Sequence, residues 1–106
     1  MDAEARFDEI VDDLAPRGVL PGALFGARSL TFDGTAFACL KGGHLAVKLG
    51  AGSAAHGAAL DLDGASLFDP SGKGRPFKDW VAVPAGESGE WGRLAEAGLA
   101  ALGGPA

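Results

Sequence analysis

Two pairs of turn residues constrain the fold of this chain more than any other feature. Asp33-Gly34 separates residues 22–32 from residues 35–41, and Gly42-Gly43 separates the latter from residues 44–49. Both pairs suit two-residue hairpin turns, whose central residues need positive φ angles. Because the three flanking segments are short and largely apolar, the sequence predicts three consecutive antiparallel strands.

The segments on either side of these strands have the periodicity of helices. Residues 3–14 and 88–102 carry apolar residues three and four positions apart, which is typical of amphipathic helices. A weaker helix is expected at about 53–60, and two strands at 66–69 and 77–83. The predicted order is therefore α-β(3)-α-β(2)-α. This is an α+β fold, with an antiparallel sheet backed by helices, in a single domain that covers residues 1–106.

The two turns also predict how the strands face. They pair Leu40 with Leu45, and residues paired across a hairpin share a face of the sheet. One face is then wholly apolar and should lie under the helices. The opposite face would carry Leu30, Phe32 and Phe37, which makes these residues a candidate apolar interface for a protein partner or a second copy. The alternative is that loops or the end of the chain cover this face.

The charge of the chain bears on its partners. Fourteen acidic residues outnumber nine basic ones, for a net charge of −5, and six of the acids lie in the first thirteen residues. This balance argues against direct DNA binding, which usually relies on a basic surface. The acidic N-terminus is unlike a signal peptide, and Cys39, the only cysteine, excludes an intrachain disulfide. We expect a cytoplasmic protein that does not enter a membrane.

One segment concentrates positive charge. Residues 71–76 are Ser-Gly-Lys-Gly-Arg-Pro, so Lys73 lies between two glycines, Arg75 follows the second, and Lys78 comes soon after. Glycines let backbone amides approach an anion, and the basic side chains would add charge. The three basic residues are candidates for binding an acidic partner or a small anion. The alternative is an ordinary solvated loop. Gly74 stands where a Walker A loop needs Ser or Thr, so that motif is absent.

A second glycine-rich segment resembles part of a nucleotide-binding motif. Residues 50–55 match G-x-G-x-x-A, and Asp69 follows about twenty residues later, as in dinucleotide-binding folds. That fold needs a parallel βαβ unit, however, and the preceding strands are joined by hairpin turns. A plain turn from strand to helix is therefore the favoured interpretation, with small-molecule, phosphate or nucleotide binding as the alternative function.

Metal-binding and catalytic residues are not evident from their spacing. Cys39, His44 and His56 are the residues best suited to bind zinc, but they form no C-x-x-C or H-x-x-x-H pair. The chain also has no G-x-S-x-G sequence around a nucleophile. We therefore predict no metal, no cofactor and no catalytic residue.

Several motifs together resemble a known family. They are Leu24-Phe25-Gly26, residues 32–38 (Phe-Asp-Gly-Thr-Ala-Phe-Ala), residues 45–49 (Leu-Ala-Val-Lys-Leu), Phe68-Asp69-Pro70 and residues 72–84 (Gly-Lys-Gly-Arg-Pro-Phe-Lys-Asp-Trp-Val-Ala-Val-Pro). This set is similar to the N-terminal domain of the TfoX/Sxy competence regulators. The resemblance spans roughly residues 5–102 and implies a fold akin to secretion chaperones. It supplies no catalytic residues. The full-length regulators also carry a helical C-terminal domain that this sequence lacks.

These observations lead to a functional hypothesis. The chain is expected to be a non-enzymatic protein-interaction module, with a regulatory role implied by the resemblance.

Overall fold

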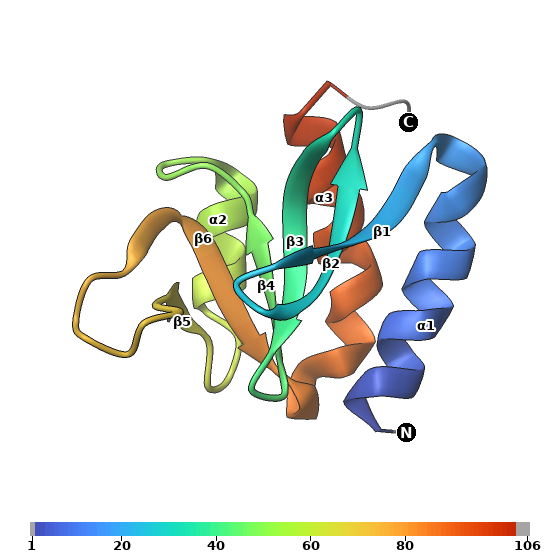
Figure 1. Cartoon of the computed structure of the whole chain (residues 1–106). Coiled ribbons are helices and arrows are strands. Elements are labelled where there is room, and N and C mark those ends of the chain that lie inside the picture. The colour runs from blue at the N-terminus through green and yellow to red at the C-terminus, as the bar shows by residue number, and fades with distance from the viewer. Residues whose placement is uncertain (1, 104–106) are drawn as a thin grey trace.

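The computed structural model describes residues 2–103 as one sheet with helices packed against it (Figure 1). Its elements are α1 (Ala3–Leu14), η1 (Ala15–Arg17), β1 (Val19–Leu24), β2 (Ala27–Phe32), β3 (Thr35–Lys41), β4 (His44–Lys48), α2 (Ala54–Leu60), β5 (Ser66–Phe68), β6 (Phe77–Pro84), η2 (Ala85–Glu90) and α3 (Trp91–Ala101). The strands are antiparallel and lie in the order β1-β2-β3-β4-β6-β5. The predicted α+β fold is confirmed.

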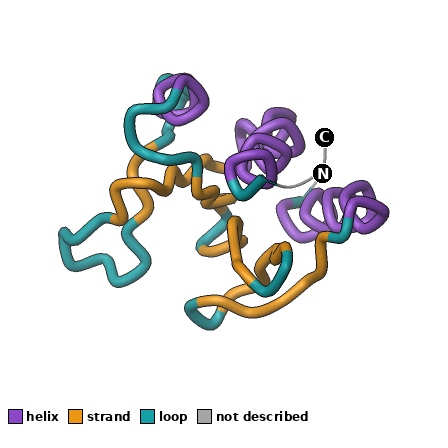
Figure 2. Tube along the Cα trace, turned by 90° about the horizontal axis from the view of Figure 1, so that it is seen from above, coloured by secondary structure: helices purple, strands orange, loops and turns teal. Residues whose placement is uncertain are grey.

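The helices all lie on one side of the sheet, as the view from above shows (Figure 2). The main hydrophobic core fills the space between the helices and the strands. It includes Phe7 and Ile10 of α1, Trp91 and Leu99 of α3, and Val47 of β4, each at most 1% exposed. Within residues 2–103, no helix is long and apolar enough to cross a membrane.

Helix α1 forms where the periodicity places it, and its ends have clear local causes. At the start, the Asp2 carboxylate accepts a hydrogen bond of 2.7 Å from the backbone amide of Ala5, which caps the helix. At the end, Pro16 lies in the short η1 turn, and Gly18 adopts a φ of 90° that side chains disfavour. The sequence signals for this helix are therefore local and unambiguous.

Both predicted hairpin turns are confirmed. Asp33-Gly34 and Gly42-Gly43 have positive φ angles at all four residues. Leu40 pairs with Leu45, as the two-residue turn requires. The face of the sheet that these two residues share packs against the helices.

A third turn divides the segment expected as one strand. Residues 22–32 do not run straight: Phe25 and Gly26 form a tight turn with φ angles of 55° and 71°, and β1 pairs back onto β2. The order is thus α-β(4)-α-β(2)-α. Phenylalanine is rare in a left-handed conformation, so the sequence contains no ordinary signal for this turn.

The predicted interface of Leu30, Phe32 and Phe37 is wrong. Leu30 and Phe37 are fully buried in the main core, and Phe32 is half-buried against it. The pairing of β2 with β3 shifts between Leu30 and Thr31, so that Leu30 lies opposite Ala38 and Phe37 is left without a partner in the register. This irregularity turns Leu30 and Phe37 toward the helices, where they cannot form a contact surface.

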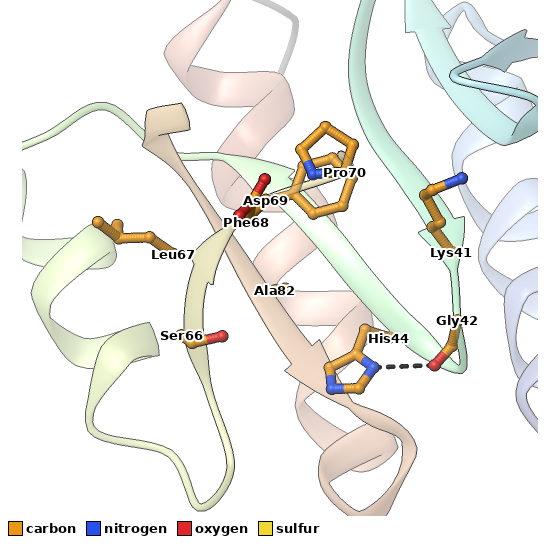
Figure 3. Close-up of a pocket in the computed structure, with 9 residues that line it drawn as sticks. All are labelled: Lys41, Gly42, His44, Ser66, Leu67, Phe68, Asp69, Pro70 and Ala82. Atoms are coloured by element: carbon orange, nitrogen blue, oxygen red, sulfur yellow. Dashed lines mark hydrogen bonds between the residues drawn. The ribbon is translucent and has the colours of Figure 1, made fainter. Parts of the chain in front are cut away.

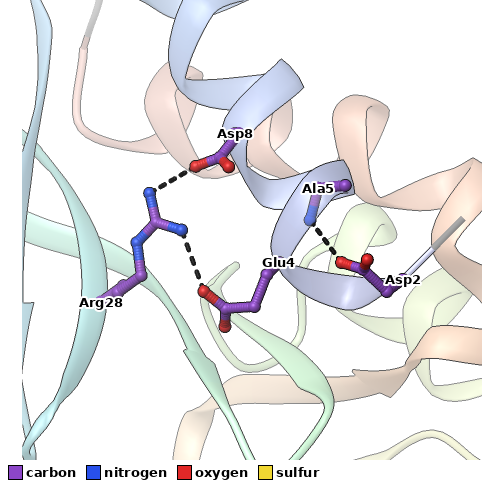
Figure 4. Close-up of polar contacts among 5 residues, drawn as sticks. All are labelled: Asp2, Glu4, Ala5, Asp8 and Arg28. Atoms are coloured by element: carbon purple, nitrogen blue, oxygen red, sulfur yellow. Dashed lines mark hydrogen bonds and ion pairs between the residues drawn. The ribbon is translucent and has the colours of Figure 1, made fainter.

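Arg28 of β2 forms ion pairs with two carboxylates of α1 (Figure 4). Its guanidinium contacts the Asp8 carboxylate at 2.6 Å and the Glu4 carboxylate at 3.0 Å, and it lies 4.8 Å from the centre of the Phe7 ring. The hydrogen bonds to Asp8 and Glu4 raise the pKa of Arg28 above its ordinary value. Part of the acidic charge of α1 is therefore neutralised within the chain.

Candidate functional site

The face of the sheet away from the helices carries a smaller cluster of apolar residues. Cys39, Ala46 and Ala82 lie on the strands, and Phe68 and Trp80 pack beside them. This face is thus partly covered by large side chains of the sheet's own strands, and the cluster contains no residue of a loop or of the end of the chain among those that the structure describes. The cover is incomplete at its edge, where Phe25 and Phe77 remain 41% and 38% exposed.

Phe25 and Phe77 come from distant parts of the chain and meet at this edge. Their ring centres are 5.4 Å apart, and each ring also lies about 6 Å from Phe68, at 6.0 and 6.2 Å. The left-handed backbone of Phe25 holds its ring at the tip of the β1–β2 hairpin. A non-glycine residue in this conformation is strained, and strain of this kind persists where the surrounding structure holds it, often at binding sites.

Two shallow hollows adjoin beside these rings. The first, of about 400 Å³, is lined by Phe25, Lys41, Pro70, Ser71, Arg75 and Phe77. The second, of about 300 Å³, shares Lys41 and Pro70 with the first and extends over Ala82 to His44 and Ser66 (Figure 3). In Figure 3 the Ser66 hydroxyl points toward the His44 side of the hollow, whereas the Lys41 ammonium points away from His44. We call the first hollow the basic-aromatic groove.

The structure separates the three predicted basic residues. Lys73, Arg75 and Lys78 are all exposed, but of these only Arg75 lines the basic-aromatic groove. Lys41 of β3 takes the second cationic position, and its ammonium donates a hydrogen bond of 3.0 Å to the carbonyl of Phe25. Sequence reasoning missed Lys41 and Phe25 as site residues, because only the unpredicted hairpin turn brings them to the groove.

Arg75 differs from the other arginines in its pairing. Arg6, Arg17, Arg28 and Arg93 each pair with a carboxylate of the chain. Among residues 2–103, no carboxylate lies within ion-pair distance of Arg75, or of the four lysines. All five of these cationic residues fall between positions 41 and 78, remote in sequence from the acids of α1. Three aspartates lie in the same stretch, and one of them, Asp69, lines the adjoining hollow, but none forms an ion pair with Arg75 or Lys41. Within residues 2–103, the two cations of the groove are therefore not neutralised by an ion pair.

The glycine-rich basic loop is already occupied by an internal anion. The Asp69 carboxylate accepts hydrogen bonds from the Ser71 hydroxyl at 3.0 Å and from the amides of Gly72 and Gly74 at 3.1 and 2.8 Å. An external anion would have to displace this carboxylate to reach those amides. A ligand of this loop would therefore contact its side chains, because the backbone amides of Gly72 and Gly74 are already engaged.

We expect this loop to lose its order at low pH. Desolvation raises the pKa of Asp69, but hydrogen bonds from the Ser71 hydroxyl and from the backbone amides of Gly74, Gly72 and Arg75 outweigh it and hold the pKa below its usual 3.8. The stabilisation is therefore present at neutral pH and is lost as the pH falls below that value. In an NMR titration, the Asp69 carboxyl should titrate below 3.8, and the Gly72 and Gly74 amides should change with it. Titration at or above 3.8 would contradict the assignment, and Asp69→Asn should show the altered amides already at neutral pH.

The backbone amides of the second glycine-rich segment are also engaged by an aspartate of the chain. The amides of Leu49 and Gly50 donate to the backbone carbonyl of Asp79 at 2.8 and 3.1 Å, and the amide of Ala51 donates to its carboxylate at 2.8 Å. Ser53 caps α2 through the His56 amide. The preceding strand, β4, is antiparallel to both of its neighbours. A dinucleotide fold would need a parallel unit here, so the resemblance to its motif is a coincidence of glycine spacing.

The residues considered for metal binding lie apart or are engaged. Cys39 is fully buried, and desolvation raises the pKa of its thiol to about 11, against a smaller opposing effect of Lys41. The His56 ring contacts the carbonyl of Lys78 at 2.7 Å, and the His44 ring contacts that of Gly42 at 3.0 Å. Within residues 2–103, no three His, Cys, Asp or Glu side chains gather as a metal site would require. The thiol is protonated at neutral pH and so is a weak nucleophile.

Comparison with protein-family models, curated proteins and solved structures found no match to this chain.

Proposed function

We propose that this protein is a non-enzymatic interaction module that binds a protein partner through the basic-aromatic groove. One observation carries the proposal: an arginine whose guanidinium forms no ion pair among residues 2–103 lies in a groove with two half-exposed phenylalanines. Arginine and aromatic residues are enriched where proteins bind one another, because they combine large apolar area with directed hydrogen bonds.

The resemblance to the TfoX/Sxy N-terminal domain supports the same site. Several residues that carry the resemblance, far apart in sequence, meet at or beside the groove: Phe25, Phe68, Pro70, Arg75 and Phe77. On this basis we propose that the protein shares that domain's fold family and acts as a regulatory module in the cytoplasm. The role would be exerted by contact rather than by chemistry.

Small-molecule, phosphate or nucleotide binding is less well supported. The two loops that suggested it have backbone amides engaged by Asp69 and Asp79. The hollows beside Lys41 are shallow and open, whereas sites for small ligands usually enclose most of the ligand. A protein segment can use an open groove because it gains contact area along its length.

The proposal is tested by capture from a cell extract with matched variants. The wild-type protein, Arg75→Ala and Arg93→Ala are immobilised and their bound proteins compared by quantitative mass spectrometry. Arg93 lies on α3, on the helix side of the sheet, and serves as the control. We expect a partner that is retained by wild type and Arg93→Ala and depleted about tenfold on Arg75→Ala, the loss typical of a residue that contributes strongly to binding.

Two results would count against the proposal. One is a set of bound proteins that does not differ between wild type and Arg75→Ala. The other is equal depletion by both arginine variants, which would indicate that general charge rather than the groove governs capture. Light scattering of the wild type and Arg75→Ala at high concentration shows whether the partner is a second copy of this chain.

A further inference from the structure

The groove also indicates what kind of partner segment it would take. We infer that the basic-aromatic groove binds an extended acidic peptide segment that carries one large apolar side chain. This inference rests on the proposed function and adds the chemistry of the partner.

The apolar part of the segment follows from the rings that line the groove. Phe25, Phe77 and Pro70 present three ring systems around one hollow of about 400 Å³. Water against these rings is displaced when an apolar side chain enters, and burial of such a side chain is the main favourable contribution in most protein contacts. A leucine, methionine or aromatic side chain matches this lining.

The acidic part follows from the charges. Arg75 and Lys41 line the same hollow, and in the described part of the chain its lining includes no carboxylate. The backbone amide of Arg75 donates to Asp69, but its guanidinium forms no ion pair there. Lys41 uses its ammonium on one carbonyl only, so side-chain donors remain for a ligand. A carboxylate beside the apolar side chain would complete these hydrogen bonds, since arginine can bind a carboxylate through two parallel ones.

The extended shape follows from the adjoining hollows. Because they share Lys41 and Pro70, a segment can run from the Phe25–Phe77 rings past Pro70 toward His44. The Asp69 carboxylate lines the second hollow, so the acids of the segment belong at the Arg75 end of this path. An extended chain advances about 3.3 Å per residue, so several residues are needed to follow such a path.

Nucleic acid is the main competing ligand, because aromatic rings beside cations also bind single strands. The balance of charge favours a peptide. A nucleic acid strand carries a charge on every nucleotide and would meet the negative field of a chain with a net charge of −5. A peptide needs only one or two acids next to the groove. Their attraction to Arg75 and Lys41 acts over a short distance, at which salt screens it little.

The test is a selection from a displayed library of random nine-residue peptides on the wild-type protein. We expect selected peptides to combine one or two acids with one large apolar residue. Binding of a consensus peptide is then measured by NMR titration, in which shifts should centre on Phe25, Lys41, Arg75 and Phe77. Arg75→Ala should weaken binding about tenfold, and so should serine in place of the apolar residue of the peptide. Arg93→Ala should have no effect, and Lys73→Ala, outside the groove, should weaken binding less than Arg75→Ala.

Several outcomes would overturn the inference. They are a consensus without acids, shifts located away from the groove, and tighter binding of a nine-nucleotide oligothymidylate than of the peptide. If no peptide is selected while Arg75→Ala still removes a protein from the extract capture, the inference fails but the proposed function stands, and the partner presents a folded surface. If neither assay depends on Arg75, both fail.

Discussion

Replacing Trp91 with alanine is expected to lower the free energy of unfolding by about 3–5 kcal/mol, the range found when a large buried aromatic side chain is removed. Trp91 is the first residue of α3, is fully buried in the main core, and donates an indole hydrogen bond of 3.1 Å to the carbonyl of Val83. Its removal leaves a cavity between α3 and the sheet. For a domain of this size, whose total stability is about 5–15 kcal/mol, the change is large.

Urea denaturation followed by circular dichroism measures this effect. Trp91→Phe keeps most of the apolar volume but loses the indole hydrogen bond, so we expect a smaller cost of about 1–2 kcal/mol. Leu20→Ala is the control, because Leu20 is 65% exposed and its removal should change stability by less than about 0.5 kcal/mol. A cost below about 1 kcal/mol for Trp91→Ala would contradict a central place for the indole in the core.

Two helical glycines should respond in opposite directions to replacement by alanine. A Cβ atom on Gly98 would lie 2.6 Å from a methyl carbon of Val47 and 3.0 Å from the Phe37 ring, closer than packed atoms tolerate. Gly98 thus allows α3 to approach the strands. The overpacking of about 1–3 kcal/mol exceeds the gain of about 1 kcal/mol in helix propensity, so we expect Gly98→Ala to destabilise the protein by up to about 2 kcal/mol.

Gly57 in α2 provides the matched control. A Cβ atom there meets nothing within 4 Å, so Gly57→Ala should stabilise the protein by about 0.5–1 kcal/mol. Val47→Ala removes the methyl group that opposes Gly98, and the double variant Gly98→Ala/Val47→Ala should cost less than the sum of the single changes. Equal effects of the two glycine replacements, or strict additivity of the double variant, would show that α3 does not make this close approach.

Much of the fold could be predicted because its signals are local. The apolar spacing of α1, its Asp2 cap and the two glycine-containing turns each involve residues within a few positions of one another. The pairing of Leu40 with Leu45 then follows from the turn length alone.

The candidate site could be predicted only in part. Arg75 is evident from the composition of its loop, but the groove also needs Phe25, Lys41 and Phe77, which approach one another through the Phe25-Gly26 turn. That turn places phenylalanine in a conformation that normally belongs to glycine or asparagine, so propensity argues against it. The Phe25 ring contacts Phe68 and Phe77, and its carbonyl accepts a hydrogen bond from Lys41, so the turn is held by residues distant in sequence.

The sequence by itself determined the α+β class, the ends of α1 and the two hairpins, because hydrogen bonding and apolar spacing within a few residues decide them. Only the tertiary structure decided which residues remain exposed. The irregular pairing of β2 with β3 turns Leu30 and Phe37 into the core, and the hairpin tip brings Phe25 to Phe77, fifty-two positions along the chain. Both outcomes depend on packing between segments that are distant in the sequence. A local sequence pattern carries no information on the free energy of such packing.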